Sequence, residues 1–209
     1  MIAIIDYGAG NLQSVEKALR HIGCDCQVAS RPEELGRAAG AVLPGVGAFG
    51  EAMAALRARG LEPAIRVYVA GGRPFLGICL GLQVLFESSE ESPGAAGLGL
   101  LPGKVLRLPG DRGLKIPHIG WNSLDVQRPG WLLKGLGPEP YLYFVHSYYL
   151  QAQDDVVSAI SQYGVSIHAA VERGNLAACQ FHPEKSGETG LKILRNFAAK
   201  VQETQEGGA

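Results

Sequence analysis

One glycine-flanked cysteine in the sequence has the residue types and spacing for nucleophilic chemistry. The run Gly77-Ile78-Cys79-Leu80-Gly81 lies between an apolar stretch of strand character and a segment of helical spacing. This is the arrangement of a nucleophile elbow, in which a sharp strand-to-helix turn aims the nucleophile outward, with cysteine in the place of serine. Glycine at positions 77 and 81 lets neighbouring backbone approach closely, and a helix start favours a thiolate. The alternative is a buried cysteine at a glycine-containing helix start.

A second run, QFHPE at residues 180–184, follows a predicted strand and contains a base and a carboxylate. His182 and Glu184 are two residues apart, and in an extended segment this spacing places both side chains on one face. There the carboxylate would orient the imidazole and stabilise its protonated form, while the imidazole reaches the cysteine. An isolated pair of this kind is more often a surface ion pair. The two runs together favour a Cys79–His182–Glu184 triad for acyl transfer.

Acyl transfer also needs hydrogen-bond donors for the negative oxygen of the tetrahedral intermediate. The run PGVG at 44–47 follows a predicted strand and offers a flexible backbone that could turn an N–H group inward, at Val46 or Gly47. The backbone N–H of Leu80, next to the nucleophile, would be the other donor. Because glycine-rich strand ends are common, this run on its own would indicate only a turn.

The first half of the chain alternates strands and helices in the pattern of a parallel sheet covered by helices. Apolar β-branched runs predict strands at 2–6, 27–29, 41–43 and 74–78. Helical spacing predicts helices at 12–22, 51–59, 63–70 and 80–88, and a further helix after residue 30. For that helix Ser30 is the expected N-cap, with Pro32 early and Glu33 completing a capping box. The nucleophile therefore falls where the fourth strand meets the next helix.

From about residue 97 the sequence becomes rich in strand-like pieces separated by turns. The clearest predicted strands are 105–108, 141–149, 156–161, 165–171 and 176–181. Helical spacing returns at 186–201, before a polar tail at 202–209 that we expect to be frayed. The sequence contains no internal repeat and no low-complexity linker. It therefore predicts one α/β domain over 1–201, with a central, mostly parallel sheet, flanking helices and a β-rich second half.

The composition excludes several classes of protein. The 209 residues carry 19 basic and 20 acidic side chains, so no global field attracts nucleic acid or an anionic membrane. The longest apolar stretch, at 75–86, is too short to cross a bilayer, and the amino-terminal residues lack the pattern of a secretory signal. The four cysteines fit neither a disulfide framework nor a zinc site, which favours a reducing, cytoplasmic setting.

Two other patterns do not predict a ligand site. The run GAG at 8–10 follows the first strand but lacks the third glycine and the later acidic residue of a dinucleotide fingerprint. Cys24 and Cys26 lack zinc spacing and Cys179 lies in an apolar strand, so all three are interpreted as packing residues. The other four histidines are too scattered to predict a metal site. We expect neither a metal nor a cofactor.

Several runs of the sequence, taken together, resemble those of one enzyme family. GICLGLQ at 77–83 with HPE at 182–184 resembles the triad-type class I glutamine amidotransferases. DYGAGN at 6–11, PGVG at 44–47, PHIGWN at 117–122 and YFVHSY at 143–148 are similar to runs in the glutaminase subunits of imidazole glycerol phosphate synthase. The resemblance spans most of the chain. It implies a flavodoxin-like fold and hydrolysis of glutamine to glutamate and ammonia.

The resemblance also implies roles for individual residues: Cys79 as nucleophile, His182 as general base and acid, and Glu184 as the group that orients the histidine. The positions that hold the substrate glutamine are matched by Gln83, Glu91, Ser147 and Tyr148. The positions that face a partner are matched by Asn11, Trp121, Tyr143 and Lys185. The implied partner, in a heterodimer, is the cyclase subunit, a (β/α)8 barrel that uses the ammonia in histidine synthesis.

Three alternatives remain open from the sequence. The chain could serve another amidotransferase, such as one that makes anthranilate, aminodeoxychorismate or pyridoxal phosphate, although the PHIGWN and YFVHSY runs argue against this. It could be a non-catalytic regulatory module on the same fold, which the intact triad disfavours. It could also hydrolyse γ-glutamyl peptides, which an assay with such peptides would reveal.

Overall fold

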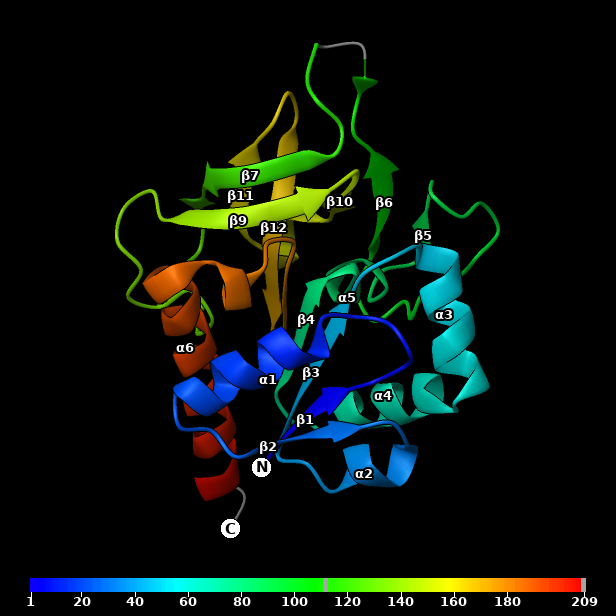
Figure 1. The fold of residues 1–209 in the computed structure, drawn as a ribbon, viewed down its shortest axis with the longest axis vertical. Coiled ribbons are helices and arrows are strands. Elements are labelled where there is room, and N and C mark those ends of the chain that lie inside the picture. Colours follow the sequence, from blue (N-terminus) through cyan, green and yellow to red (C-terminus); the bar gives the residue numbers. More distant parts are fainter. Residues whose placement is uncertain (111–112, 208–209) are drawn as a thin grey trace.

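The computed structural model describes residues 1–110 and 113–207 and is organised around an eight-stranded sheet (Figure 1). Its strands are β1 Ile2–Ile5, β2 Cys26–Ala29, β3 Gly40–Gly45, β4 Phe75–Cys79, β8 Asp125–Val126, β11 Val157–Gln162, β12 Ser166–Arg173 and β13 Leu176–Cys179. They lie in the order β2-β1-β3-β4-β13-β12-β11-β8. Neighbours from β2 to β13 are parallel, and those from β13 to β8 are antiparallel. The predicted α/β fold class is confirmed.

Alternate residues of the central strands face opposite sides of this sheet and build two cores. In β1, Ala3 and Ile5 belong to one core, and Ile2 and Ile4 belong to the other. Three helices cover the first face and two cover the second (Figure 1). They are α2 Pro32–Gly36, α3 Phe49–Ala58 and α4 Leu61–Ala70 on the first face, and α1 Leu12–His21 and α6 Gly187–Glu206 on the second. Because both faces are covered, the parallel strands are apolar almost throughout.

The β-rich second half adds two small sheets. They are formed by β7 His118–Ser123 with β9 Tyr141–His146, and by β5 Ser88–Ser89, β6 Gly103–Arg107 and β10 Tyr148–Ala152. The predicted strand at 141–149 is two strands, because the chain passes from one sheet to the other at Ser147. The sequence pattern does not predict β7, where Gly120 and Asn122 interrupt the apolar residues.

The helix predicted at 80–88 is much shorter in the structure. Helix α5 comprises only Leu80–Gln83. The carbonyl groups of Val84, Leu85 and Phe86 accept hydrogen bonds from backbone N–H groups at residues 98–101 instead of continuing a helix. A later segment of the chain therefore ends the helix, which local periodicity could not predict.

Two other helix ends differ from the sequence predictions. The N-cap of α2 is Arg31, not Ser30. The glutamate of the capping box is Glu34, not Glu33. Its carboxylate accepts hydrogen bonds from the backbone N–H groups of Ser30 at 2.9 Å and Arg31 at 3.2 Å. Helix α6 continues past residue 201 to Glu206, into the predicted tail. Glutamate and glutamine in these last turns are good helix formers and need no burial.

Candidate active site

Cys79 lies at the end of β4, on the turn into α5. Its φ of 56° and ψ of −110° belong to a region that residues other than glycine rarely adopt. A methyl group on Gly81 would lie 1.8 Å from the carbonyl oxygen of Leu43, and one on Gly77 would lie 2.7 Å from the carbonyl oxygen of Gly81. Close backbone contact therefore requires both glycines, and the turn has the geometry of a nucleophile elbow. Because α5 has a single turn, its dipole adds little at the sulfur.

His182 and Glu184 follow β13 and lie at the 3₁₀ turn Pro183–Lys185. Their side chains are 4% and 1% exposed, and His182 Nδ1 is 2.7 Å from Glu184 Oε1. The backbone N–H of His182 donates to the carbonyl of Tyr143 at 2.9 Å, and the hydroxyl of Ser186 donates to the carbonyl of His182 at 2.6 Å. The structure brings the predicted imidazole and carboxylate together. A turn places them on one side, rather than the extended strand that the spacing suggested.

The environment of His182 favours its protonated form. Burial alone would lower the pKa of this histidine, but the Cys79 sulfur and the Glu184 carboxylate outweigh burial and raise the pKa to about 10. Its Nε2 atom is buried and has no hydrogen-bond partner among the described residues. Because Nδ1 is bonded to Glu184, Nε2 is the nitrogen available to exchange a proton with a reacting group.

A cavity of about 140 Å³ opens beside Cys79. It is lined by Val46, Gly47, Cys79, Leu80, Gln83, Glu91, His146, Ser147 and Tyr148. Every residue that the sequence assigned to the oxyanion or to the substrate therefore lines the same hollow as the nucleophile. The cavity lies where β3 and β4 end at their carboxyl termini, the usual place for a ligand in an open α/β sheet.

Two of the residues expected to bind glutamine have side-chain hydrogen bonds within the protein. Gln83 Nε2 donates to the carbonyl of Tyr148 and to Gln180 Oε1, at 3.0 Å each. Glu91 Oε2 accepts from the backbone N–H of Phe49 at 2.8 Å, at the start of α3. These bonds hold an amide and a carboxylate at the cavity wall, where they can recognise a small polar ligand.

Gln180 is a residue of the site that the sequence analysis did not assign. Its side chain is fully buried, and its Nε2 lies 3.7 Å from Cys79 Sγ. One signal could have indicated it, because Gln180 stands two residues before His182 in the QFHPE run and can reach the same region.

His146, which lines the cavity, and His118, which contacts His146, were also not assigned. His118 Nδ1 lies 3.0 Å from His146 Nε2, and His146 Nδ1 lies 2.9 Å from the carbonyl of Tyr148. Because a carbonyl only accepts, His146 Nδ1 carries a proton, and His118 donates to His146 Nε2. Burial lowers the pKa of His118 to about 4 and that of His146 to about 3, so both rings are neutral near pH 7. The pairing of β7 with β9 brings these histidines together.

Three of the four predicted partner-facing residues gather on the outer face of the β7–β9 sheet. Trp121 and Tyr143 are cross-strand neighbours whose ring centroids are 6.1 Å apart, and Lys185 Nζ lies 5.9 Å from the centroid of the Tyr143 ring. Trp121 is 55% exposed, and Ile119 and Tyr141 beside it are 59% and 58% exposed. We call Ile119, Trp121, Tyr141 and Tyr143 the β7–β9 apolar face.

The fourth such residue, Asn11, lies at the N-cap of α1. Its Oδ1 accepts from the backbone N–H of Ser14 at 3.4 Å. Helix α1 contacts the turn Pro183–Lys185 and lies beside the segment that leads into α6 (Figure 1). Asn11 is thus on an element adjacent to the segment that contains His182, and it also has an ordinary role as a helix cap.

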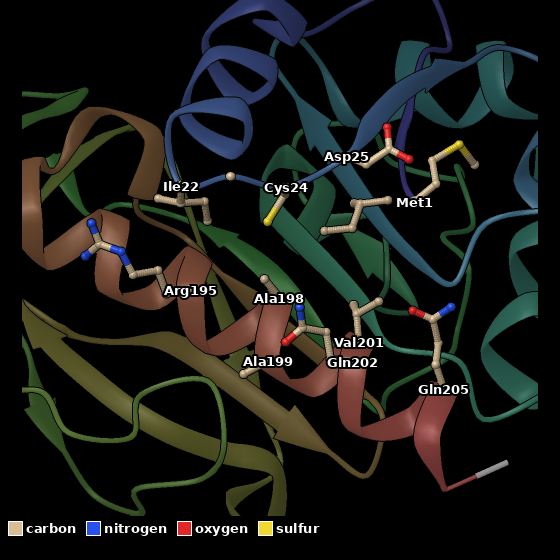
Figure 2. Close-up of a pocket in the computed structure, with 12 residues that line it drawn as sticks. Met1, Ile22, Cys24, Asp25, Arg195, Ala198, Ala199, Val201, Gln202 and Gln205 are labelled. Carbon is tan, nitrogen blue, oxygen red and sulfur yellow. The ribbon is translucent and has the colours of Figure 1, made fainter. Parts of the chain in front are cut away.

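A larger cavity of about 360 Å³ lies at the opposite end of the sheet, between the start of β1, residues 22–25 and the second half of α6 (Figure 2). Its lining includes the Cys24 thiol but no histidine. Burial raises the pKa of that thiol, which makes it a poorer nucleophile at neutral pH. Acyl chemistry is therefore assigned to the smaller cavity.

Cys26 and Cys179 are buried, Cys24 is partly buried, and all are free thiols, as expected for packing residues. Over residues 1–110 and 113–207, no three histidine, cysteine or carboxylate side chains cluster as metal ligands would. Within the same ranges, none of the helices has the length and apolar character that a membrane crossing requires.

Comparison with known proteins gives the class. The family model for glutamine amidotransferase class-I matches residues 3–201. A crystal structure of a glutamine amidotransferase superposes with a TM-score of 0.76 at 21% identity, covering 97% of this chain and 100% of the other. PurLQS from Thermotoga maritima gives a TM-score of 0.77 at 21% identity, covering 96% and 98%. At this identity the two structures establish the fold, and with the family model they define a class I glutamine amidotransferase.

Sequence relatives narrow the class. Imidazole glycerol phosphate synthase subunit HisH of Methanothermobacter thermautotrophicus is 56% identical over 202 residues, covering 97% of this chain and 100% of the relative. The subunits HisH of Desulfitobacterium hafniense and Moorella thermoacetica are 53% and 50% identical, each covering at least 96% of both chains. The chain belongs to the class I glutamine amidotransferase family and, within it, to the HisH subunits of imidazole glycerol phosphate synthase. The family predicted from the sequence runs is confirmed.

Proposed function

We propose that the chain hydrolyses glutamine to glutamate and ammonia through Cys79, His182 and Glu184. It passes the ammonia to the cyclase subunit, which makes imidazole glycerol phosphate and aminoimidazole carboxamide ribotide in histidine biosynthesis. The observation that carries the proposal is a cavity lined by the elbow cysteine and by all the expected glutamine-binding positions. The paired His182 and Glu184 are buried, and the Cys79 sulfur helps to raise the pKa of His182. Membership of the HisH family supports glutamine as the substrate.

The first half of the reaction transfers the glutamyl group to the sulfur. The Cys79 thiolate attacks the side-chain amide carbon of glutamine, and the carbonyl oxygen becomes an oxyanion. The N–H groups of Leu80 and of Val46 or Gly47 donate to that oxygen. When the C–N bond breaks, the Nε2–H of protonated His182 gives its proton to the leaving nitrogen, and ammonia departs. A γ-glutamyl thioester and a neutral imidazole remain.

The second half restores the enzyme. His182 Nε2 takes a proton from a water molecule as the water oxygen attacks the thioester carbon. The same donors hold the second oxyanion. The C–S bond then breaks, glutamate leaves, and the Cys79 thiolate is again paired with a protonated His182. Glu184 stays ionised throughout and orients the ring through the 2.7 Å contact with Nδ1. The net change is glutamine plus water to glutamate, ammonia and one proton, which the new γ-carboxyl group releases.

The cavity wall supplies groups that hold the amino-acid end of glutamine. The Glu91 carboxylate can accept from the substrate's α-ammonium group, which bears the opposite charge. Gln83, Ser147 and Tyr148 line the remaining wall with amide, hydroxyl and backbone groups. These contacts fix the distance between the α-carbon and the reacting amide, so the side chain of glutamine reaches Cys79 while a shorter amide does not.

The β7–β9 apolar face is the surface that we assign to the cyclase subunit. Exposed aromatic residues are typical of the centre of a protein interface, and a charged residue such as Lys185 is typical of its rim. The face is also near the nucleophile, because Cys79 Sγ lies 3.9 Å from the carbonyl of Val145, which is on the same strand as Tyr141 and Tyr143. Ammonia in water at neutral pH is mostly ammonium, which is not nucleophilic. Transfer across a protein interface keeps it reactive.

We also propose that residues 1–201 form one domain that works in the cytoplasm. The eight-stranded sheet combines strands from both halves of the chain, so neither half has a complete core of its own. Four free thiols fit a reducing compartment.

The proposal is tested by assembling the chain with the cyclase subunit and measuring synthase turnover with glutamine or with ammonium as nitrogen source. Cys79→Ala is expected to abolish turnover with glutamine and to retain turnover with ammonium. Cys24→Ala, a cysteine outside the site, is expected to retain both. Glutamine-dependent turnover by the Cys79→Ala complex would contradict the triad. Stimulation by a different synthase, but not by the cyclase subunit, would contradict the partner assignment. Hydrolysis of γ-glutamyl peptides in preference to glutamine would instead identify the chain as a γ-glutamyl peptide hydrolase.

A further inference from the structure

The structure assigns a further catalytic role to Gln180: its side-chain amide donates a hydrogen bond to the Cys79 sulfur and stabilises the thiolate. This inference rests on the proposed function, because it concerns the same nucleophile. It adds a residue outside the triad, outside the expected oxyanion donors and outside the expected glutamine-binding positions.

The orientation of the Gln180 amide follows from its neighbours. Gln83 Nε2 lies 3.0 Å from the carbonyl of Tyr148, which can only accept, so that atom of Gln83 is a donor. The same nitrogen lies 3.0 Å from Gln180 Oε1, which must therefore be the oxygen. The NH2 group of Gln180 is then the end that faces Cys79 Sγ, at 3.7 Å. A flipped amide would oppose two NH2 groups and turn an oxygen toward a thiolate.

The position of Gln180 is fixed by burial and by its backbone. The residue is 0% exposed, and its N–H donates to the carbonyl of Ala169 at 2.8 Å. Gln180 contacts the sulfur from the segment that follows β13, and His182 in the same segment is close enough for the sulfur to raise its pKa. The sulfur therefore has a protonated base and a neutral donor close to it. Because the site is buried away from bulk water, a hydrogen bond to a charged group is strong there.

A neutral donor suits both halves of the reaction. It lowers the free energy of the thiolate before attack and again when the thioester expels the sulfur. Unlike a lysine or arginine, it adds no positive charge that would disfavour the protonated form of His182, which must give its proton to the leaving nitrogen. Helix α5 has one turn only, so its dipole cannot supply this stabilisation alone.

The test is the pH dependence of Cys79 alkylation by iodoacetamide in the full chain, followed on the Cys79 peptide by mass spectrometry because Cys24 is also partly exposed. Gln180→Leu is expected to move the midpoint of the profile up by about one pH unit, which is a tenfold smaller thiolate fraction at pH values well below the midpoint. Gln180→Glu is expected to move it further, since a carboxylate would face the thiolate while still accepting from Gln83. In the complex, Gln180→Leu is expected to lower kcat at least tenfold with a smaller change in KM.

Ser161→Ala is the matched control, because it removes another buried hydrogen bond, from the Ser161 hydroxyl to the carbonyl of Ser123 at 2.9 Å. Its alkylation profile is expected to match the wild type. A wild-type profile in folded Gln180→Leu would overturn the inference. If that variant does not fold, a wild-type profile in Gln180→Glu would overturn it equally. Alkylation needs neither glutamine nor the partner. A shifted midpoint in a chain without glutaminase activity would therefore contradict the proposed function and support the role of Gln180. Normal glutamine hydrolysis with unshifted profiles would support the proposed function and contradict the role of Gln180.

Discussion

Replacing Gly81 by alanine tests whether backbone contact holds the nucleophile elbow. The added methyl carbon would lie 1.8 Å from the carbonyl oxygen of Leu43, where real contacts essentially never fall below 3.0 Å. The elbow and β3 would have to separate by about the difference, on the order of 1 Å. Overpacking lowers the free energy of unfolding by roughly 1–3 kcal/mol. We expect a loss near the upper end of this range, because neither side of the contact is a flexible side chain. A loss of about 3 kcal/mol corresponds to a fall in Tm of about 6–12 °C for a chain of this length.

Thermal unfolding and glutaminase kinetics of Gly81→Ala in the complex provide the assay. A displacement near 1 Å at the nucleophile is expected to lower kcat/KM by about 100-fold. Gly36→Ala is the matched control, because no atom lies within 4 Å of the added methyl at the end of α2. The control is expected to keep full activity and to be equal to the wild type or more stable by up to about 1 kcal/mol. A Gly81→Ala variant with a Tm within about 2 °C of wild type and normal kinetics would refute the argument.

Three further predictions concern charge, the partner and the substrate. The folded protein holds His182 with a pKa of about 10, above its ordinary 6.5, so this stabilisation is complete below pH 6.5 and is lost as the pH rises through 10. Urea unfolding at pH 6.5 and pH 10 measures how much unfolding free energy is lost between them. This loss is expected to be smaller in Glu184→Gln than in the wild type, and equal losses would contradict the ion pair. Trp121→Ala is expected to leave Tm unchanged and to weaken binding of the cyclase subunit by about 30-fold or more in calorimetry. The control Val67→Ala, at a residue on α4 that is 70% exposed, should bind normally, and a Trp121→Ala affinity like that of the control would exclude the β7–β9 apolar face. Glu91→Gln is expected to raise KM for glutamine more than kcat falls, and a loss confined to kcat would argue against a contact with the α-ammonium group.

The parts of the site that depend on local sequence could be predicted. The elbow is a local structure, and the contacts at Gly77 and Gly81 explain why glycine flanks Cys79. Strands β1, β3 and β4 were also predictable, because each is an apolar run buried on both faces. The spacing of His182 and Glu184 indicated a pair even though a 3₁₀ turn replaces the expected strand.

The parts that depend on distant segments could not be predicted. The contact of Gln180 with Cys79 joins residues 101 positions apart, and the pairing of His118 with His146 depends on the register of β7 against β9. Helix α5 ends early because backbone N–H groups at residues 98–101 take the carbonyls that would continue it. Periodicity and capping signals describe only neighbours in the chain, so they contain no information on such contacts.

The most direct test of the account is whether a glutamyl group becomes attached to the Cys79 sulfur during turnover. The complex with the cyclase subunit would be mixed with radiolabelled glutamine, quenched in acid during steady state and digested. We predict label on the peptide that contains Cys79, released by mild base as expected for a thioester, and no label in Cys79→Ala. Glutamate release at the wild-type rate by Cys79→Ala, or label on a different residue, would contradict the central claim.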